Sequence, residues 1–221
     1  MTTVLIIGAS RGIGLELVRQ YRADNCRVIA TARDDAGLQA IQALGAQALR
    51  VDVAKPASVS ALDWQLDGEK IDMALYVAGV MDRASARTPP TQETFDHVMH
   101  ANVMGAMMVV PQVAAKVEEA NGVFAFFSSQ MGSLQNTRSS DAALYRISKA
   151  ALNMVVRTAQ HDYPRARMVA VHPGWVQTDM GGMQATLTPT QSVTQLRQML
   201  AAVTDAHKGQ FLSYDSTPLP W

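Results

Sequence analysis

The sequence contains little charge and almost no cysteine. Of its 221 residues, 17% are charged, and 19 basic side chains balance 19 acidic ones, so the formal net charge is zero. This balance argues against nucleic acid or an anionic membrane as a partner. The single cysteine, Cys26, excludes an intramolecular disulfide and a zinc site made from several cysteines.

Long hydrophobic runs and metal-binding clusters are also missing. No segment reaches 18 consecutive apolar residues, and the opening stretch "MTTVLIIGAS" carries no signal-peptide pattern. We therefore expect a cytoplasmic protein without a membrane span. His97 and His100 share a predicted helix face but have no acidic or cysteine partner at metal-ligand spacing, so we predict no metal site.

The sequence does contain an alternation of short apolar runs with longer segments of helical period. Strands are predicted near residues 3–7, 26–31, 48–52, 72–77, 123–128, 168–172 and 210–213, and helices near 12–23, 35–44, 56–65, 91–118, 142–161 and 189–203. This order predicts one α/β domain over residues 1–221, with a doubly wound, mainly parallel, seven-stranded sheet covered by helices on both faces.

Two polar stretches, residues 81–90 and 131–142, interrupt this alternation. Each follows the carboxyl end of a predicted strand, where open α/β sheets bind ligands. Each stretch is therefore either part of a ligand site or a plain surface loop.

A glycine-rich turn, "GASRGIG", joins the first predicted strand to the first helix. Glycines at this junction let the chain turn, approach a pyrophosphate and pack the helix on the strand, as in a Rossmann fold. The free N–H groups at the helix start favour phosphate. The residues expected to bind a dinucleotide here are Gly8, Ser10, Arg11, Gly12, Ile13 and Gly14.

The end of the second predicted strand indicates which nicotinamide cofactor is used. NAD sites usually carry an acidic residue there, whereas this chain has Arg33, with Arg11 in the glycine turn. Two guanidinium groups suit a 2′-phosphate, so NADP(H) is favoured, with NAD(H) possible. We interpret Asp34 and Asp35 as the start or cap of the next helix.

Asp52 and Val53 follow the third predicted strand. The Asp52 carboxylate can accept a hydrogen bond from the adenine amino group while Val53 packs near the ring. The alternative is an aspartate that only caps a helix or a turn.

Tyr145 and Lys149 are spaced i, i+4 in "AALYRISKAALNMV" and therefore share one helix face. A phenol has an ordinary pKa near ~10, and a neighbouring ammonium favours its ionised form. The pair is a candidate proton donor and acceptor.

With the glycine turn, Asn102 and Ser129, this pair resembles the short-chain dehydrogenase/reductases over the whole chain. The segments "VHPGWVQTDMGG" and "FLSYDSTPLPW" are similar to the C-factor/sniffer-type carbonyl reductases within that family. The resemblance implies an NADP(H)-dependent enzyme that reduces a ketone or aldehyde to an alcohol. It also leaves open a signalling or cofactor-sensing protein with little or no turnover.

The resemblance also implies roles for the four catalytic positions. Tyr145 is the general acid in reduction, Lys149 binds the nicotinamide ribose and lowers the Tyr145 pKa, and Ser129 orients the substrate carbonyl. Ser129 is preferred to Ser128 because it stands three residues before a glycine, Gly132. Asn102 interrupts a helix and holds a water that links Lys149 to solvent.

The remaining cofactor contacts come from two further segments. The resemblance assigns the nicotinamide side to Pro173, Gly174, Val176 and Thr178, and the ribose side to Ala78 and Gly79. The chain departs from the family before Ala78, where Tyr76-Val77 replaces the usual Asn-Asn.

Methionines adapt to irregular apolar shapes, so a pliable substrate pocket is one interpretation of those near the predicted site, and core filling is the other. The substrate candidates are Met131, Trp175, Met180 and Met183.

The segments "ANVMGAMMVVPQVAAKV" and "ALNMVV" are apolar nearly all round, although a helix with one face on a sheet should leave the other face polar. We therefore expect a homo-oligomer, at least a dimer, with these helices at the interface.

Overall fold

The computed structural model describes residues 1–221, and its centre is a seven-stranded sheet in the order β3-β2-β1-β4-β5-β6-β7. Every pairing between neighbouring strands is parallel. This confirms the predicted doubly wound architecture. The strands are β1 Thr3–Ile7, β2 Arg27–Ala32, β3 Gln47–Arg50, β4 Met73–Tyr76, β5 Val123–Phe127, β6 Arg167–His172 and β7 Gln210–Ser213.

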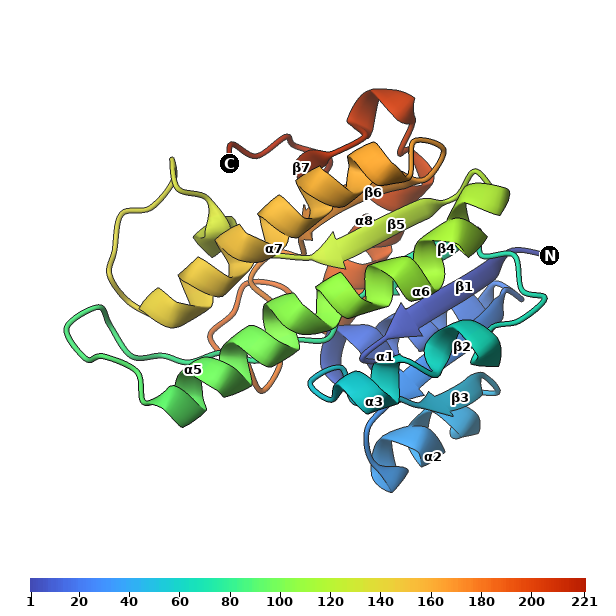
Figure 1. Ribbon diagram of the computed structural model, residues 1–221, viewed down its shortest axis with the longest axis horizontal. Coiled ribbons are helices and arrows are strands. Elements are labelled where there is room, and N and C mark those ends of the chain that lie inside the picture. The colour runs from blue at the N-terminus through green and yellow to red at the C-terminus, as the bar shows by residue number, and fades with distance from the viewer.

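Helices cover both faces of the sheet because successive strand residues point to opposite sides. In β1, Val4 and Ile6 belong to one buried apolar cluster, while Leu5 and Ile7 belong to the other. Figure 1 shows α6 and α7 in front of the sheet, with α8 behind it. The helices are α1 Gly12–Ala23, α2 Asp35–Ala43, α3 Pro56–Val59, α4 Leu62–Gln65, α5 Gln92–Met99, α6 Gly105–Glu119, α7 Ala143–Asp162 and α8 Pro189–Ala201.

Two predicted helices are interrupted in the structure. The segment expected as one helix over 56–65 is two single turns, α3 and α4, separated at Ser60 and Ala61. The segment expected over 91–118 is divided into α5 and α6 by a π-helical turn, His100–Met104, which contains Asn102. The predicted interruption of this helix at Asn102 is therefore confirmed.

The helical stretch Gln92–Glu119 is long and apolar enough to cross a membrane by length and composition alone. This is weak evidence for a membrane span, since half of its most apolar window is buried inside the fold. Its α6 part contributes Val109, Val113 and Val117 to the apolar core on one face of the sheet. The helix therefore fits the role of a core helix.

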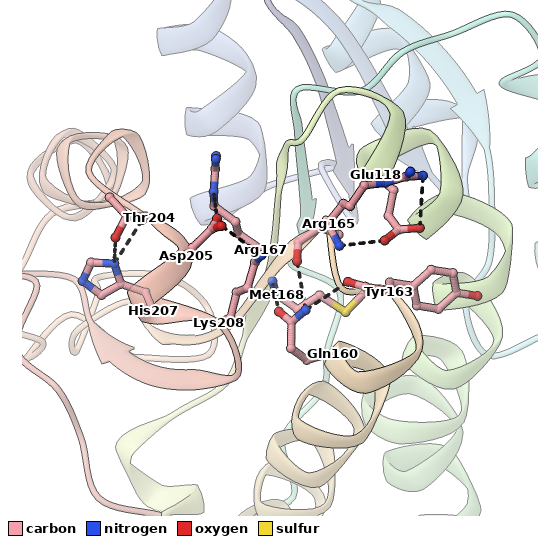
Figure 2. A network of polar contacts seen from close by, with 11 residues as sticks. Glu118, Gln160, Tyr163, Arg165, Arg167, Met168, Thr204, Asp205, His207 and Lys208 are labelled. Atoms are coloured by element: carbon pink, nitrogen blue, oxygen red, sulfur yellow. Dashed lines mark hydrogen bonds and ion pairs between the residues drawn. The ribbon is translucent and has the colours of Figure 1, made fainter.

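At the edge where the strands begin, side-chain amides satisfy the main chain. Gln160, near the end of α7, donates to the carbonyls of Tyr163 at 3.0 Å and Ala166 at 2.9 Å. Its own carbonyl accepts from the Met168 amide at 2.8 Å. Figure 2 shows that this single side chain fastens the turn between α7 and β6.

Charged side chains continue the same network beside this turn (Figure 2). Asp205 pairs with Arg167 at 2.9 Å and with Lys208 at 3.2 Å. Glu118, in the last turn of α6, accepts from the Arg165 amide at 2.8 Å. The start of β6 is therefore held to α6, to α7 and to the segment before β7.

Candidate active site

A cleft of about 730 Å³ opens along the other edge, where the strands end. Its wall is built from the segments that follow β1 to β6, and it includes several residues that the sequence did not single out, among them Val80 and Asp179. The predicted site residues that line it are Gly8, Ser10, Arg11, Gly12, Ile13, Gly14, Arg33, Asp52, Val53, Ala78, Gly79, Tyr145, Lys149, Pro173, Thr178 and Met180.

The glycine turn leaves open space at the start of α1. Gly8 has φ 91°, and a Cβ there would lie 2.7 Å from the main chain of Ala78. Gly14 lies so close to Gly8 that a Cβ would stand 2.2 Å from the Gly8 carbonyl oxygen. These contacts require glycine and keep the cleft floor free of side chains.

The start of α1 is also unsatisfied in a way that suits a phosphate. The helices α2, α5 and α8 each begin with a side-chain cap, whereas α1 has none and has no acidic residue in its first turn. Its first N–H groups therefore face the cleft without a protein acceptor. The residues present fit a dinucleotide, whose pyrophosphate would be bound here.

The charges at the end of β2 are arranged as the sequence predicted. Asp34 caps α2 by accepting from the Gly37 amide at 2.8 Å, and Asp35 pairs with Arg50. Both carboxylates are thus engaged, while the Arg33 side chain is 61% exposed and only approaches Asp34, at 3.9 Å. The edge of the cleft presents the Arg33 guanidinium beside an Asp34 carboxylate that already caps α2.

Arg11 and Asp52 have partners within the protein as well as a place on the cleft wall. Arg11 pairs with Asp179 at 2.7 Å, and both side chains are largely exposed. Asp52 accepts from the Ala54 amide at 3.1 Å and lies 3.6 Å from Lys55. The turn role that was the alternative for Asp52 is therefore present in the structure, and Asp52 also lines the cleft.

Tyr145 and Lys149 lie side by side on α7, with Lys149 Nζ 5.6 Å from the centre of the Tyr145 ring. Burial raises the pKa of Tyr145 to about 12, and the neighbouring Ser129 hydroxyl opposes this by lowering it. Burial lowers the pKa of Lys149 to about 8, and its Nζ donates to the Phe127 carbonyl at 2.7 Å. Burial therefore decides the direction of the Tyr145 pKa, and the opposing contribution comes from Ser129 and not, as expected, from Lys149.

The two adjacent serines after β5 point in different directions. Ser128 donates to Asn153 at 2.6 Å and is turned toward α7. The Ser129 hydroxyl accepts from the Met131 amide at 3.1 Å and stands near Tyr145, and its residue is only 8% exposed. The preference for Ser129 over Ser128 as the group beside the phenol agrees with this geometry, although Ser129 is not part of the cleft wall.

Asn102 is completely buried behind the cleft wall. Its amide accepts from the Val80 N–H at 2.8 Å and donates to the Val80 carbonyl at 2.8 Å and to Ser148 at 2.9 Å. Ser148 in turn donates to the Tyr145 carbonyl at 2.7 Å. The side chain thus ties the segment after β4 to the helix that carries Tyr145, and its role in holding a water stays a prediction.

Tyr76 takes the place that the family often gives to asparagine. It is fully buried, stacks at a tilt on Phe126, and donates to the Ala101 carbonyl at 2.8 Å. That carbonyl belongs to the π-helical turn next to Asn102. Val77 packs against one of the apolar clusters. The phenol therefore supplies a bond between β4 and the π-helical turn that a shorter side chain would not reach.

Of the four residues predicted on the nicotinamide side, Pro173 and Thr178 line the cleft. The Thr178 hydroxyl accepts from the Gly181 amide at 3.1 Å and so closes a local turn. Val176 is buried and Gly174, at φ 85°, packs on Tyr214, so neither reaches the cleft. Their proximity to the nicotinamide stays a prediction.

Of the four substrate candidates, only Met180 lines the cleft. Met183 is 80% exposed, and Trp175 is half exposed with its indole N–H donated to the Gly181 carbonyl. Met131 lies in the short turn after Ser129, outside the cleft wall. The turn Thr178–Gly181 and a bond from Arg83 to the Met180 carbonyl hold this segment over the cleft and turn Met183 outward.

Sequence reasoning missed Ser148 and Asn153, which connect the predicted catalytic residues. Both are almost completely buried in α7. One signal was available, because Asn153 continues the four-residue spacing of Tyr145 and Lys149.

The cleft at the strand ends and the tyrosine–lysine pair beside it place the chain among the nucleotide-dependent oxidoreductases. The family model described as short chain dehydrogenase matches residues 2–187. The chain belongs to this family and is an NAD(P)-dependent oxidoreductase, which confirms the resemblance seen in the sequence.

Individual relatives span a range of roles. The chain is 31% identical to 1-hydroxy-2-glutathionyl-2-methyl-3-butene dehydrogenase of Rhodococcus sp. strain AD45 over 231 aligned positions that cover both proteins fully. It is 44% identical to the C-signal protein of Myxococcus xanthus over 99 residues, which are 44% of this chain and 60% of C-signal.

Solved structures resemble the fold over its whole length. Carbonyl reductase Sniffer of D. melanogaster has a TM-score of 0.88 at 27% identity, with all of both chains covered. A carbonyl reductase from Pseudomonas aeruginosa PAO1 in complex with NADP has a TM-score of 0.84 at 31% identity, again over both complete chains.

Proposed function

We propose that the protein is an NADP(H)-dependent carbonyl reductase that converts a ketone or aldehyde to an alcohol. The observation that carries the proposal is the pair Tyr145 and Lys149 on the wall of a cleft that fits a dinucleotide, with the Ser129 hydroxyl beside the phenol. When bound, NADPH supplies the hydride that is added to the carbonyl carbon. The chain's own residues supply position and a proton.

Tyr145 is the proton donor in this proposal. Because burial raises its pKa to about 12, the phenol stays protonated at neutral pH and can donate to the developing alkoxide. The Ser129 hydroxyl, beside it, donates a hydrogen bond to the same oxygen and fixes its orientation. A positive charge on Lys149 and on the oxidised nicotinamide then stabilises the phenolate that is left.

Lys149 restores the proton. Burial lowers the pKa of Lys149 to about 8, which is close to neutral pH. Lys149 can therefore give a proton to the phenolate and take one back from solvent. Because the Asn102 side chain is bound to Val80 and Ser148, we assign Asn102 the role of holding the π-helical turn in place.

The choice of NADP(H) is supported by the end of β2. Arg33 and Arg11 both line the cleft, while Asp34 and Asp35 are engaged in capping and pairing. A 2′-phosphate would find two guanidinium groups, and the Asp34 carboxylate beside them is already used to cap α2. The NADP complex of the similar P. aeruginosa carbonyl reductase agrees with this assignment.

The test is a turnover screen with the purified protein. NADPH oxidation is followed with ketones, quinones and aldehydes, and NADH is used in parallel. We expect at least one carbonyl class to be reduced with NADPH, and NADPH to bind at least ~10-fold more tightly than NADH, about 1.4 kcal/mol. Absence of NADPH binding would overturn the proposal, and equal use of NADH would show that Arg11 and Arg33 do not read a 2′-phosphate.

A second candidate is a signalling or cofactor-sensing protein with little turnover, and the 44% identity to part of C-signal favours it. The two candidates differ in what they need from Tyr145. A sensor would bind NADPH and keep its biological activity in a Tyr145→Phe variant, whereas a reductase would lose turnover in that variant.

We also propose that the protein is a homo-oligomer formed across α6 and α7. Phe95 in α5, Met107 in α6, and Ile147 and Met154 in α7 are between 41% and 62% exposed. Ile147 and Met154 lie seven residues apart and so share one helix face. Sedimentation is expected to give a dimer or tetramer, and a stable monomer at micromolar concentration would contradict the proposal.

A further inference from the structure

Asn153 is a buried polar residue that the proposed chemistry does not use. It lies in α7 one turn beyond Lys149, is 4% exposed, and is not part of the cleft wall. Burying a side-chain amide costs free energy unless the amide is hydrogen-bonded. The hydrogen-bond partners of Asn153 therefore show which segment it holds in place. Both partners belong to the short segment that carries Ser129.

The Asn153 amide binds this segment on both sides of Ser129. Its carbonyl oxygen accepts from the Ser128 hydroxyl at 2.6 Å, and its nitrogen donates to the Gly132 carbonyl at 3.4 Å. The Ser128 hydroxyl is also 3.4 Å from the Lys149 carbonyl. One side chain therefore fastens the residue before Ser129 and the residue three positions after it to the helix that carries Tyr145.

The segment rests directly on the main chain of α7. A Cβ on Gly132 would stand 2.8 Å from the Lys149 carbonyl carbon and 3.0 Å from the Ala150 nitrogen, so only glycine allows this contact. Ser129 itself accepts from the Met131 amide within its own turn, and its hydroxyl stands beside the Tyr145 phenol. The segment that Asn153 holds therefore sets the distance between these two hydroxyl groups.

We propose that Asn153 is a positioning residue that sets the alignment of the Ser129 hydroxyl with the Tyr145 phenol. The inference rests on the proposed reductase function, because Asn153 acts through Ser129. Three residues spaced four apart on α7 then serve one site. Tyr145 donates the proton, Lys149 restores it, and Asn153 holds Ser129 in position beside Tyr145. A displacement of about 1 Å in such a group lowers turnover by up to ~100-fold.

The experiment measures the effect of Asn153→Leu on kcat in two backgrounds. Leucine has nearly the same shape as asparagine but cannot form the two side-chain hydrogen bonds. In the wild-type background we expect kcat to fall ~10-fold while the Kd for NADPH changes less than ~2-fold. In a Ser129→Ala background we expect Asn153→Leu to change kcat less than ~2-fold, since the group it positions is already gone. A crystal structure of Asn153→Leu should show residues 128–132 shifted relative to Tyr145.

A matched control separates positioning from general destabilisation. Gln160→Leu removes another hydrogen-bonded amide from the same helix, a half-buried one two turns further on, where it holds the start of β6. We expect it to lower Tm at least as much as Asn153→Leu and to leave kcat unchanged. If both variants lower kcat equally, the effect of Asn153 is loss of stability and the inference is wrong.

The outcomes also separate this inference from the proposed function. If Ser129→Ala leaves kcat unchanged, the proposed role of Ser129 fails. If Ser129→Ala lowers kcat but Asn153→Leu does not, or the two effects multiply in the double variant, only the Asn153 inference fails. Should Asn153→Leu not fold, Ser128→Ala removes the shorter of the two bonds, and the same comparison with Ser129→Ala decides the question.

Discussion

At the edge where the strands of the sheet begin, polar side chains bind one another and the main chain. At the edge where the strands end, polar side chains line an open cleft. At the starting edge, Gln160 makes three hydrogen bonds and Asp205 has two cationic partners. At the finishing edge, the first turn of α1 is uncapped and Lys149 is buried with one hydrogen bond. The same parallel sheet thus has one satisfied edge and one unsatisfied edge.

The pKa directions express this difference in energetic terms. Hydrogen bonds from Arg167 and Lys208 hold the pKa of Asp205 below its ordinary value, so its charged form is favoured by folding. Burial lowers the pKa of Lys149 to about 8 and raises that of Tyr145 to about 12, so the charged forms of both are disfavoured. The edge where the strands begin therefore stabilises the fold. At the edge where the strands end, the buried Lys149 and Tyr145 lower the stability but supply reactive groups.

The largest effect is expected from Tyr145→Phe, which removes the proposed proton donor and keeps the ring. Loss of a general acid lowers kcat by ~100-fold to ~10,000-fold, and we expect a value in this range because Ser129 alone has no suitable proton affinity. The Kd for NADPH should change less than ~2-fold, as measured by titration of protein fluorescence or by calorimetry. A variant that keeps more than a tenth of wild-type kcat would remove Tyr145 from the proposed mechanism.

Lys149→Met tests whether the finishing edge gives up stability for activity. We expect kcat to fall at least ~100-fold because the phenolate loses its stabilising charge. At pH 7 we expect the free energy of unfolding to rise by about 1–3 kcal/mol, because a buried ammonium is removed and only one hydrogen bond, to Phe127, is lost.

The pH dependence of that stability difference has a definite sign. Between pH 8 and 10.5 the unfolded chain keeps the Lys149 proton that the folded chain has released, so wild-type stability rises with pH across this window. The Met variant lacks this rise, and its advantage should shrink as pH increases. Chemical denaturation of both proteins at several pH values measures the difference, and an advantage that is constant with pH would contradict the lowered pKa of Lys149.

Arg33→Ala should affect cofactor choice more than turnover. Because Arg33 is the freer of the two guanidinium groups, we expect its loss to weaken NADPH binding ~10-fold, about 1.4 kcal/mol, and to leave NADH binding within ~2-fold. Raising the salt concentration should weaken NADPH binding in the wild type more than in the variant. Equal losses for NADPH and NADH would show that Arg33 contacts the shared part of the two cofactors.

The features that were predictable from the sequence are those that repeat locally. The apolar runs of β1 and β5, the glycine turn, the cap at Asp34 and the Tyr145–Lys149 spacing each depend on residues within a few positions of one another. Local patterns of this kind fix strands, helix starts and helix faces. The fold class and most of the cleft wall follow from them.

The features that were not predictable depend on contacts between distant segments. Nothing in the sequence shows that Asn153 reaches Ser128, 25 positions earlier, or that the Asn102 amide is used by Val80. Met183 was placed near substrate because it follows a site loop, yet the path of that loop is set by bonds from Trp175 and Arg83. Side chains that connect elements are visible only when the elements are assembled.

The smallest effect on turnover is expected from Gln160→Leu at the starting edge. Its three main-chain partners would be left without a hydrogen bond inside the turn between α7 and β6, so we expect a loss of about 1–3 kcal/mol in the free energy of unfolding. The cleft lies at the opposite ends of the strands, and kcat and the Kd for NADPH should both stay within ~2-fold of wild type. Urea denaturation together with steady-state kinetics makes the measurement. A large loss of kcat without loss of stability would mean that the two edges are coupled through α7, and the division between a stabilising edge and a reactive edge would then be wrong.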